Sequence, residues 1–180
     1  MVFEPQVKTC GPVNSFTAAE VAAILRERGW LRREDDAVAG WLAEAAALLG
    51  PQAADRETLA SLLALIFEYD ARAVLASRAC QEVLARAGAR EVLRALATEI
   101  LSGGPVDSNR LKDVVSALKV KLPYRSRDIF LPLRVSVAGR VGEGELDRVI
   151  LLLDRAVQTE GLAPVKSVRT RILEFCSALD

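Results

Sequence analysis

Apolar residues recur every three or four positions along most of the chain, which is the spacing of one buried face of an α-helix. The first such stretch follows Thr17 and Glu20, which have the spacing of a capping box. Its apolar face begins at Val21, and Gly29 offers a left-handed end. The pattern predicts a first helix over residues 17–29.

The same order of polar cap, apolar face and glycine or proline stop predicts further helices along the chain. They are a helix capped by Asp35 or Asp36 and ended by Gly50 and Pro51, a helix around residues 59–66, one helix from Val74 to Leu84 closed by Gly88, a helix around 92–100, a helix capped by Asp107 or Ser108 over 111–118, a helix from Glu143 to Ala156, and a last helix with Pro164 in its first turn.

One segment is ambiguous from its pattern. Apolar residues alternate with a period of two from Ile129 to Val137, which favours a strand. Pro132 argues against a paired central strand, but would be tolerated near the start of a helix. The pattern alone leaves both structures open.

The strongest break in the chain is the Ser-Gly-Gly-Pro sequence at 102–105. We therefore expect three parts. They are an extended N-terminal arm over residues 1–16, which lack periodicity, a helical subdomain over 17–104 and a second helical subdomain over 105–180.

The composition excludes several kinds of chemistry. The 180 residues include no histidine, so triads that need one and histidine-containing zinc sites are excluded. The three cysteines, at 10, 80 and 176, are far apart and are expected to be reduced thiols. We expect no catalytic residue, metal or cofactor in this chain. No apolar run is long enough for a membrane helix, and the expected location is cytoplasmic.

The net charge of zero conceals a basic window. Between Arg110 and Arg140 there are eight basic and two acidic side chains, a local charge of +6, so the rest of the chain carries −6. Tyr124 and Phe130 lie among these cations. Cations that bind phosphate next to aromatic rings that stack on bases are typical of RNA-binding surfaces. A solvated basic face is the alternative.

Residues 128–139, around Pro132, read Asp-Ile-Phe-Leu-Pro-Leu-Arg-Val-Ser-Val-Ala-Gly. This segment resembles the Leu-Phe-x-Pro-Leu-Arg-x-Ala-Leu-Thr-Gly run in the anticodon-binding domain of bacterial glutamyl-tRNA synthetases. A Glu-Leu pair at 145–146 and a Leu-Leu pair at 152–153 follow in the family's order. The resemblance implies an all-α fold of two helical subdomains of the class I synthetase anticodon-binding type, with residues 129–137 helical and Pro132 near the start of that helix.

The resemblance also implies roles for individual residues. Arg134 corresponds to the arginine that contacts the anticodon, and Gln52 to the residue that reads its third base. Glu143 and Leu146 are further candidates for contact with the anticodon. Together with the basic window, the candidates for RNA binding are completed by Tyr124 as a base-stacking ring and by six phosphate contacts: Arg110, Lys119, Lys121, Arg125, Arg127 and Arg140.

The catalytic half of such a synthetase is missing. Its HIGH-type motif requires histidine, of which the sequence has none, and no GxxxxGK[ST] phosphate loop occurs. The sequence therefore predicts a free-standing module that binds tRNA of the glutamate type in translation and does not aminoacylate it alone. Two alternatives stay open. The chain is the C-terminal part of a split or truncated synthetase that works with a catalytic partner, or it is a paralogue that binds another protein and has lost RNA binding.

Overall fold

The structure is a computed structural model, and it describes residues 16–104, 106–140 and 146–179. Over these residues it is all helical apart from turns, links and one isolated β-bridge. The elements are α1 (Ala18–Glu27), α2 (Asp36–Leu49), the 3-10 helix η1 (Gly50–Gln52), α3 (Arg56–Phe67), α4 (Ala71–Ala76), α5 (Arg78–Leu84), α6 (Ala89–Leu101), α7 (Ser108–Lys121), α8 (Ser126–Ala138), α9 (Leu146–Gln158) and α10 (Val168–Leu179).

The predicted all-α class and several predicted helix ends are confirmed. The Thr17 hydroxyl accepts from the Glu20 amide at 3.3 Å, and the Glu20 carboxylate accepts from the Thr17 amide at 2.8 Å. Asp35 rather than Asp36 caps α2, through the Val38 amide at 2.9 Å. Gly29 has a φ of 72°, the left-handed conformation that glycine adopts without steric cost.

The prediction of one helix from Val74 to Leu84 is wrong, because the structure has two short helices there. Ser77 separates α4 from α5 with an extended backbone, at φ −69° and ψ 141°. Its hydroxyl accepts a hydrogen bond from the Cys80 amide at 3.2 Å and thereby caps α5. The apolar spacing continues across this break, so the capping serine was the signal that the pattern missed.

The ambiguous segment is helical, but Pro132 does not lie near the start of its helix. Helix α8 begins at Ser126, which makes Pro132 the seventh of its 13 residues. A proline inside a helix removes one backbone hydrogen bond and crowds the preceding turn. Pro132 is buried together with Ile129 and Leu133, so tertiary packing outweighs this local cost.

The ends of the last two helices also differ from prediction. Helix α9 begins at Leu146 in the described part of the chain, while Glu143, where we placed its start, lies outside the described residues. Helix α10 begins at Val168, four residues after Pro164, so the prediction of Pro164 in its first turn is wrong. Residues 159–167 instead form a connection, in which Leu162 makes an antiparallel bridge to Leu31 and the Ala163 amide donates to the Trp30 carbonyl at 2.7 Å.

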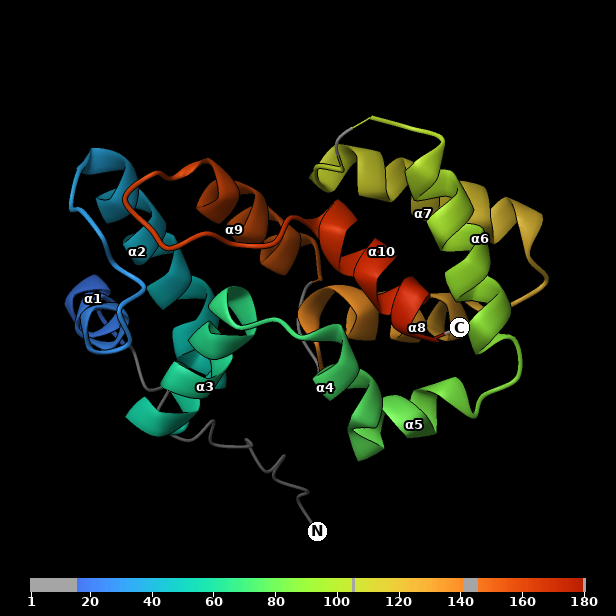
Figure 1. The fold of residues 1–180 in the computed structure, drawn as a ribbon, viewed down its shortest axis with the longest axis horizontal. Helices are drawn as coiled ribbons and strands as arrows, with labels where there is room; N and C mark the ends of the chain where they lie inside the picture. The colour runs from blue at the N-terminus through green and yellow to red at the C-terminus, as the bar shows by residue number, and fades with distance from the viewer. Residues whose placement is uncertain (1–15, 105, 141–145, 180) are drawn as a thin grey trace, which may run out of the picture.

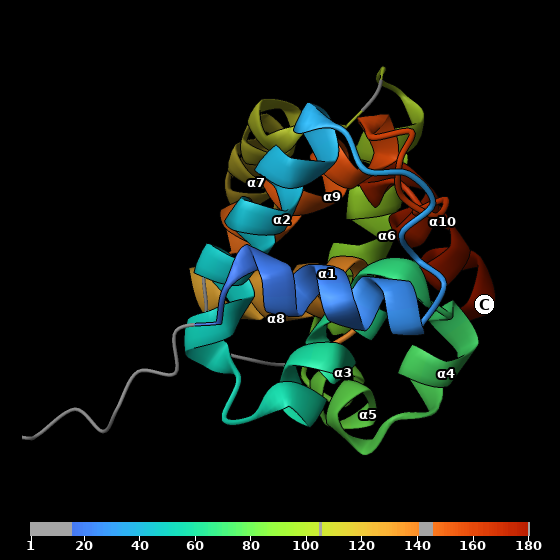
Figure 2. The ribbon, with the colours of Figure 1, turned by 90° about the vertical axis from the view of Figure 1, so that its left-hand side faces the viewer.

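The helices before and after the break at 102–105 share one core. Figure 1 shows α1, α2, α3 and α9 on one side and α4 to α8 with α10 on the other, and Figure 2 shows α1 outermost in the first group. Helix α9 packs on α2, and the buried Trp41 indole donates to the Leu152 carbonyl at 3.0 Å. Helix α10 packs on α4, α6 and α8. The predicted subdomain boundary therefore runs between helices that are in contact in space.

Arg171 of α10 lies in the middle of this arrangement and is only 1% exposed. Its guanidinium donates to the carbonyls of Leu65 at 2.9 Å, Ile66 at 2.5 Å and Val137 at 3.0 Å, which belong to the last turns of α3 and α8. Burial lowers the pKa of Arg171 to about 10, which still leaves it positively charged at neutral pH. The partial negative charge at the C-terminal ends of the two helices stabilises this cation.

No helix in the described residues is both long and apolar enough to cross a membrane.

Candidate nucleic-acid interface

The basic window lies on α7, α8 and the link between them. Leu111, Val114, Val115 and Leu118 occupy the inner face of α7, so the cations of that helix are displaced toward solvent. Helix α8 has 13 residues, which gives it a length of about 20 Å at a rise of about 1.5 Å per residue. The predicted cations are therefore separated along α8 into two groups.

The first group lies where α7 turns into α8, and we call it the turn cluster. It consists of Lys119, Lys121, Tyr124, Arg125 and Arg127. The four cations are all exposed. The ammonium of Lys119 lies 5.0 Å from the centroid of the Phe130 ring, within the range of a cation–π contact. The structure thus brings five of the predicted RNA-binding residues to one corner of the molecule.

Two members of the turn cluster are held by acidic residues of α6. Lys121 forms an ion pair with Glu99, and the Tyr124 hydroxyl donates to the Glu91 carboxylate at 2.5 Å. This hydrogen bond raises the pKa of Tyr124. The phenol end of Tyr124 also lies so close to Gly88 that a Cβ there would overlap it, and Gly88 has a φ of 81°. Tyr124 therefore packs the turn onto the start of α6. Among the residues that the structure describes, no carboxylate forms an ion pair with Lys119, Arg125 or Arg127.

The second group lies toward and just beyond the C-terminal end of α8, and we call it the Gln52 cluster: Gln52, Arg134 and Arg140. The Arg140 guanidinium donates to the Gln52 side-chain oxygen at 2.5 Å, although 88 positions separate the two residues. Gln52 in turn donates to the Leu48 carbonyl at 2.8 Å, which fixes its amide at the end of α2. Two predicted RNA-binding residues that are far apart in the sequence, Gln52 and Arg140, are thus in contact.

The Gln52 cluster brings two positive charges close together. Burial lowers the pKa of Arg140, and the positive charge of Arg134 lowers it further. Arg134 and Arg140 are both half-buried. The guanidinium of Arg134 is therefore close enough to act on the ionisation of Arg140, and two like charges are neighbours in this cluster.

The other predicted residues are not brought into either cluster. Arg110 is at the far end of α7 from the turn and lies against Gly103, where a Cβ would overlap its guanidinium. Glu143 lies outside the described residues. Leu146 is the first residue of α9, and its side chain is not described.

One residue of the corner was missed by the sequence reasoning. Arg86, just after α5, brings its guanidinium to 3.7 Å from the Asp128 carboxylate in the first turn of α8. This ion pair brings Arg86 to the first turn of α8, the helix that also carries Arg127. Arg86 lies about 40 positions before Arg125 and Arg127 in the chain, so no local sequence motif predicts its contact with α8.

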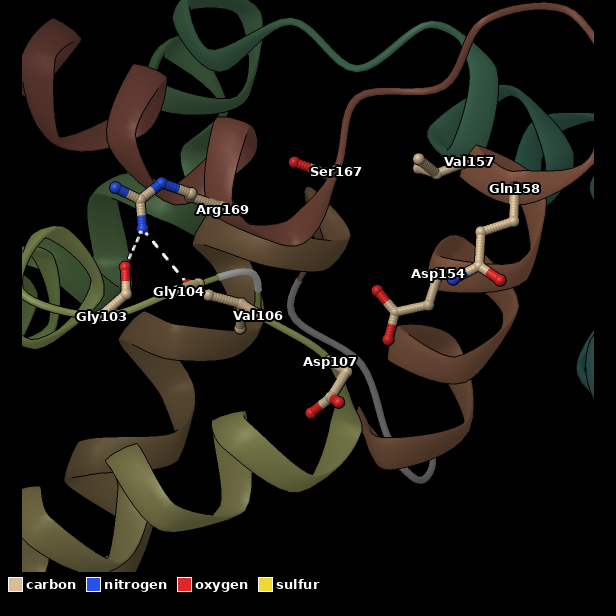
Figure 3. A pocket seen from close by; sticks show the side chains of 9 residues that line it. All are labelled: Gly103, Gly104, Val106, Asp107, Asp154, Val157, Gln158, Ser167 and Arg169. Atoms are coloured by element: carbon tan, nitrogen blue, oxygen red, sulfur yellow. Dashed lines mark hydrogen bonds between the residues drawn. The ribbon is translucent and has the colours of Figure 1, made fainter.

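A cleft of about 390 Å³ lies where α6, α7, α9 and α10 meet (Figure 3). Its charged groups mostly serve the ends of helices. Asp107 caps α7 through the Arg110 amide at 2.7 Å, and Arg169 donates to the carbonyls of Ile100 at 2.5 Å and Gly103 at 2.9 Å. Figure 3 shows Asp154 on the opposite wall, so the cleft carries two carboxylates and does not resemble a phosphate site.

Among the residues that the structure describes, no group of three or more cysteine, aspartate or glutamate side chains could hold a metal ion. Comparisons with protein-family models, with curated proteins and with solved structures found no match. The resemblance to glutamyl-tRNA synthetases stays a prediction.

Proposed function

We propose that this chain is a tRNA-binding module that acts through α7 and α8 and does not catalyse aminoacylation by itself. The observation that carries the proposal is the meeting of Gln52 with Arg140 beside Arg134. The resemblance named Gln52 and Arg134 as anticodon contacts, and the basic window independently named Arg140. The contact supports the proposal because three residues selected by two different arguments lie at one place.

The spacing of the two clusters suits one RNA strand. They lie toward opposite ends of α8, where Arg127 and Arg134 are seven residues apart, about 10 Å along the axis at a rise of about 1.5 Å per residue. A short stretch of one strand can therefore reach both clusters. In this proposal, the turn cluster contacts phosphates, while Gln52 and Arg134 face the bases, where amide and guanidinium groups pair with base edges.

The test is a titration of fluorescently labelled tRNA with the whole chain, followed by anisotropy at several salt concentrations. We expect binding that weakens as salt rises, with a log–log slope of about 0.7 to 0.9 per phosphate contacted. The variant Arg134→Gln/Arg140→Gln is expected to lose about 1–3 kcal/mol of binding free energy for each base contact removed.

The matched control is Arg33→Gln/Arg78→Gln, which removes two positive charges at exposed arginines outside both clusters. If both double variants weaken binding equally, the effect comes from net charge and the Gln52 cluster has no special role. Absence of tRNA binding at micromolar protein and low salt contradicts the proposal altogether.

Binding of another protein is the second candidate function, and two exposed apolar side chains favour it. Leu101 at the end of α6 is 61% exposed, and Val120 near the end of α7 is 88% exposed. Large apolar side chains this exposed occur in some protein contact surfaces. This reading predicts no binding of tRNA in the titration above, and that outcome would favour it over the first.

A further inference from the structure

A cleft of about 260 Å³ lies between α7 and α8. Its floor is apolar and consists of Leu111 and Val115 of α7 with Leu133 of α8, all of which are buried. It is a different cavity from the one in Figure 3, and Lys119 is the one residue of the two clusters among its lining residues.

The rim of this cleft combines an aromatic ring with polar groups. Phe130 is half-buried on the α8 side, and Lys112, Ser116 and Lys119 line the α7 side, all three exposed. The Ser116 hydroxyl donates to the Lys112 carbonyl at 2.8 Å, which leaves its oxygen as an acceptor. The Lys119 ammonium lies 5.0 Å from the centre of the Phe130 ring, so cation and ring are next to one another.

The spacing of these residues puts them on facing stripes of the two helices. On α7, positions 112, 116 and 119 follow the i, i+4, i+7 spacing of one helix face. On α8, Arg127, Phe130 and Arg134 follow the i, i+3, i+7 spacing. Phe130 therefore lies between a cation of the turn cluster and a cation of the Gln52 cluster, on the path between them.

We propose that this cleft holds one unpaired nucleotide of a bound RNA, with the base against Phe130 and its phosphate near Lys119. An apolar floor, an aromatic wall and a cation at the rim are the complement of a flat base that carries an anionic group. The volume is just below the roughly 300 Å³ at which pockets for drug-sized ligands begin, which suits a base with its sugar. The inference rests on the proposed function, because the RNA supplies the nucleotide.

The experiment uses the full chain with labelled methyl groups and follows the NMR signals of Leu111, Val115 and Leu133. The probes are inorganic phosphate, adenosine 5′-monophosphate and a single-stranded oligoadenylate RNA. We expect the methyl signals of these three residues to shift with the mononucleotide and with the RNA. We expect no shift with phosphate alone, because phosphate has no flat apolar face that could contact the floor of the cleft.

Two variants test the contacts. Phe130→Leu keeps an apolar side chain and removes the stacking face, and we expect it to weaken RNA binding by roughly five- to a hundredfold. Lys119 is exposed, so we expect Lys119→Gln to leave the fold intact. We expect the same variant to weaken both nucleotide and RNA binding. Lys166→Gln removes the same charge in the connection before α10, where Lys166 pairs with Glu174, and is expected to change neither.

The outcomes separate this inference from the function on which it rests. If tRNA binds and depends on Arg134 and Arg140, but Phe130→Leu and Lys119→Gln bind normally and the methyl signals do not shift, the cleft is not a nucleotide site and the proposed function stands. If the chain binds the mononucleotide but neither the oligoadenylate nor tRNA, the assignment of the cleft to RNA is overturned. If Phe130→Leu unfolds, which circular dichroism would show, the Lys119→Gln result decides.

Discussion

Arg171 is buried and Arg140 is half-buried, both near the C-terminal end of α8, but their surroundings differ. Arg171 donates to carbonyls in the last turns of two helices and stacks over Tyr69 at 4.5 Å from the ring centre. Arg140 has an amide oxygen of Gln52 as its acceptor and a second guanidinium, Arg134, as its electrostatic neighbour. The hydrogen-bond donors of the first cation are satisfied by backbone carbonyls, whereas the second cation lies beside a like charge.

This difference separates a structural arginine from a candidate binding arginine. A buried charge is tolerated where fixed dipoles and hydrogen bonds replace the lost water. A half-buried charge beside a like charge is less favourable in the free protein and becomes more favourable when an anion arrives. The two arginines should therefore respond to substitution in opposite ways, one in stability and the other in binding.

The largest expected effect is on stability, from Arg171→Met. The substitution leaves the carbonyls of Leu65, Ile66 and Val137 without their donor in the core, at a cost of about 3–5 kcal/mol in the free energy of unfolding. Urea denaturation measures it. Arg171→Lys, which keeps the charge but not the planar fork, should fall between Met and the parent. A Met variant as stable as the parent would remove the basis of the comparison.

A smaller loss is expected from Tyr69→Phe, next to Arg171. The Tyr69 hydroxyl donates to the Ser136 carbonyl at 2.6 Å in the interior, and burial raises the pKa of the phenol. Phenylalanine keeps the ring under the guanidinium but loses this bond, so we expect a cost of about 1 kcal/mol in urea denaturation. A loss as large as that of Arg171→Met would mean that the hydroxyl, and not the guanidinium, holds the three helices together.

Arg140→Gln should have almost no effect on the free energy of unfolding. Its side chain is half-buried, its neighbour Arg134 repels it, and glutamine can still pair with Gln52, so we expect a change within about 0.5 kcal/mol. Chemical denaturation of this variant beside Arg171→Met gives the contrast directly. A loss of several kcal/mol would show that Arg140 is a structural residue like Arg171.

The smallest expected effect concerns the N-terminal ends of α2 and α3, which are capped by the carboxylates of Asp35 and Asp55. Backbone amides lower the pKa of Asp35 and Asp55 below the usual 3.8. Because these groups have a lower pKa in the folded chain than in the unfolded one, their contribution is present above that value and is lost as the pH falls. Asparagine caps as well but does not titrate in this range.

We therefore expect Asp35→Asn/Asp55→Asn to lose less stability than the parent between pH 5 and pH 2, measured by urea denaturation across that range. Asp113→Asn, an exposed change in the middle of α7, serves as the control. An acid dependence equal to that of the parent would show that other carboxylates control it.

Local signals explain what the sequence could predict. Thr17 with Glu20, Asp35 and Gly29 act on backbone groups within a few positions, so their effects are visible in a short stretch of sequence. The break at Ser77 and the position of Pro132 within α8 were missed because apolar spacing continues through both. Burial of Pro132 decides its place, and burial depends on helices that are distant in sequence.

The same distinction applies to the candidate site. The charge of the window and the Pro-Leu-Arg motif could be found in the sequence, and the structure brings most of the named residues into two clusters. The contact of Arg140 with Gln52 and that of Arg86 with Asp128 could not, since each joins residues that lie dozens of positions apart. The role of Arg171 was missed for the same reason, because its partners in α3 lie more than 100 positions earlier.

The place of α10 in the interior bears on how the protein is made in the cell. Synthesis proceeds from the N-terminus, so the ends of α3 and α8 leave the ribosome before the guanidinium that they surround. Until Arg171 emerges, the carbonyls it will satisfy stay hydrated, and the surfaces of α4, α6 and α8 that α10 covers stay exposed. A chain cut before Val168 lacks α10, which completes the core. We therefore expect an added protease to degrade such a chain quickly.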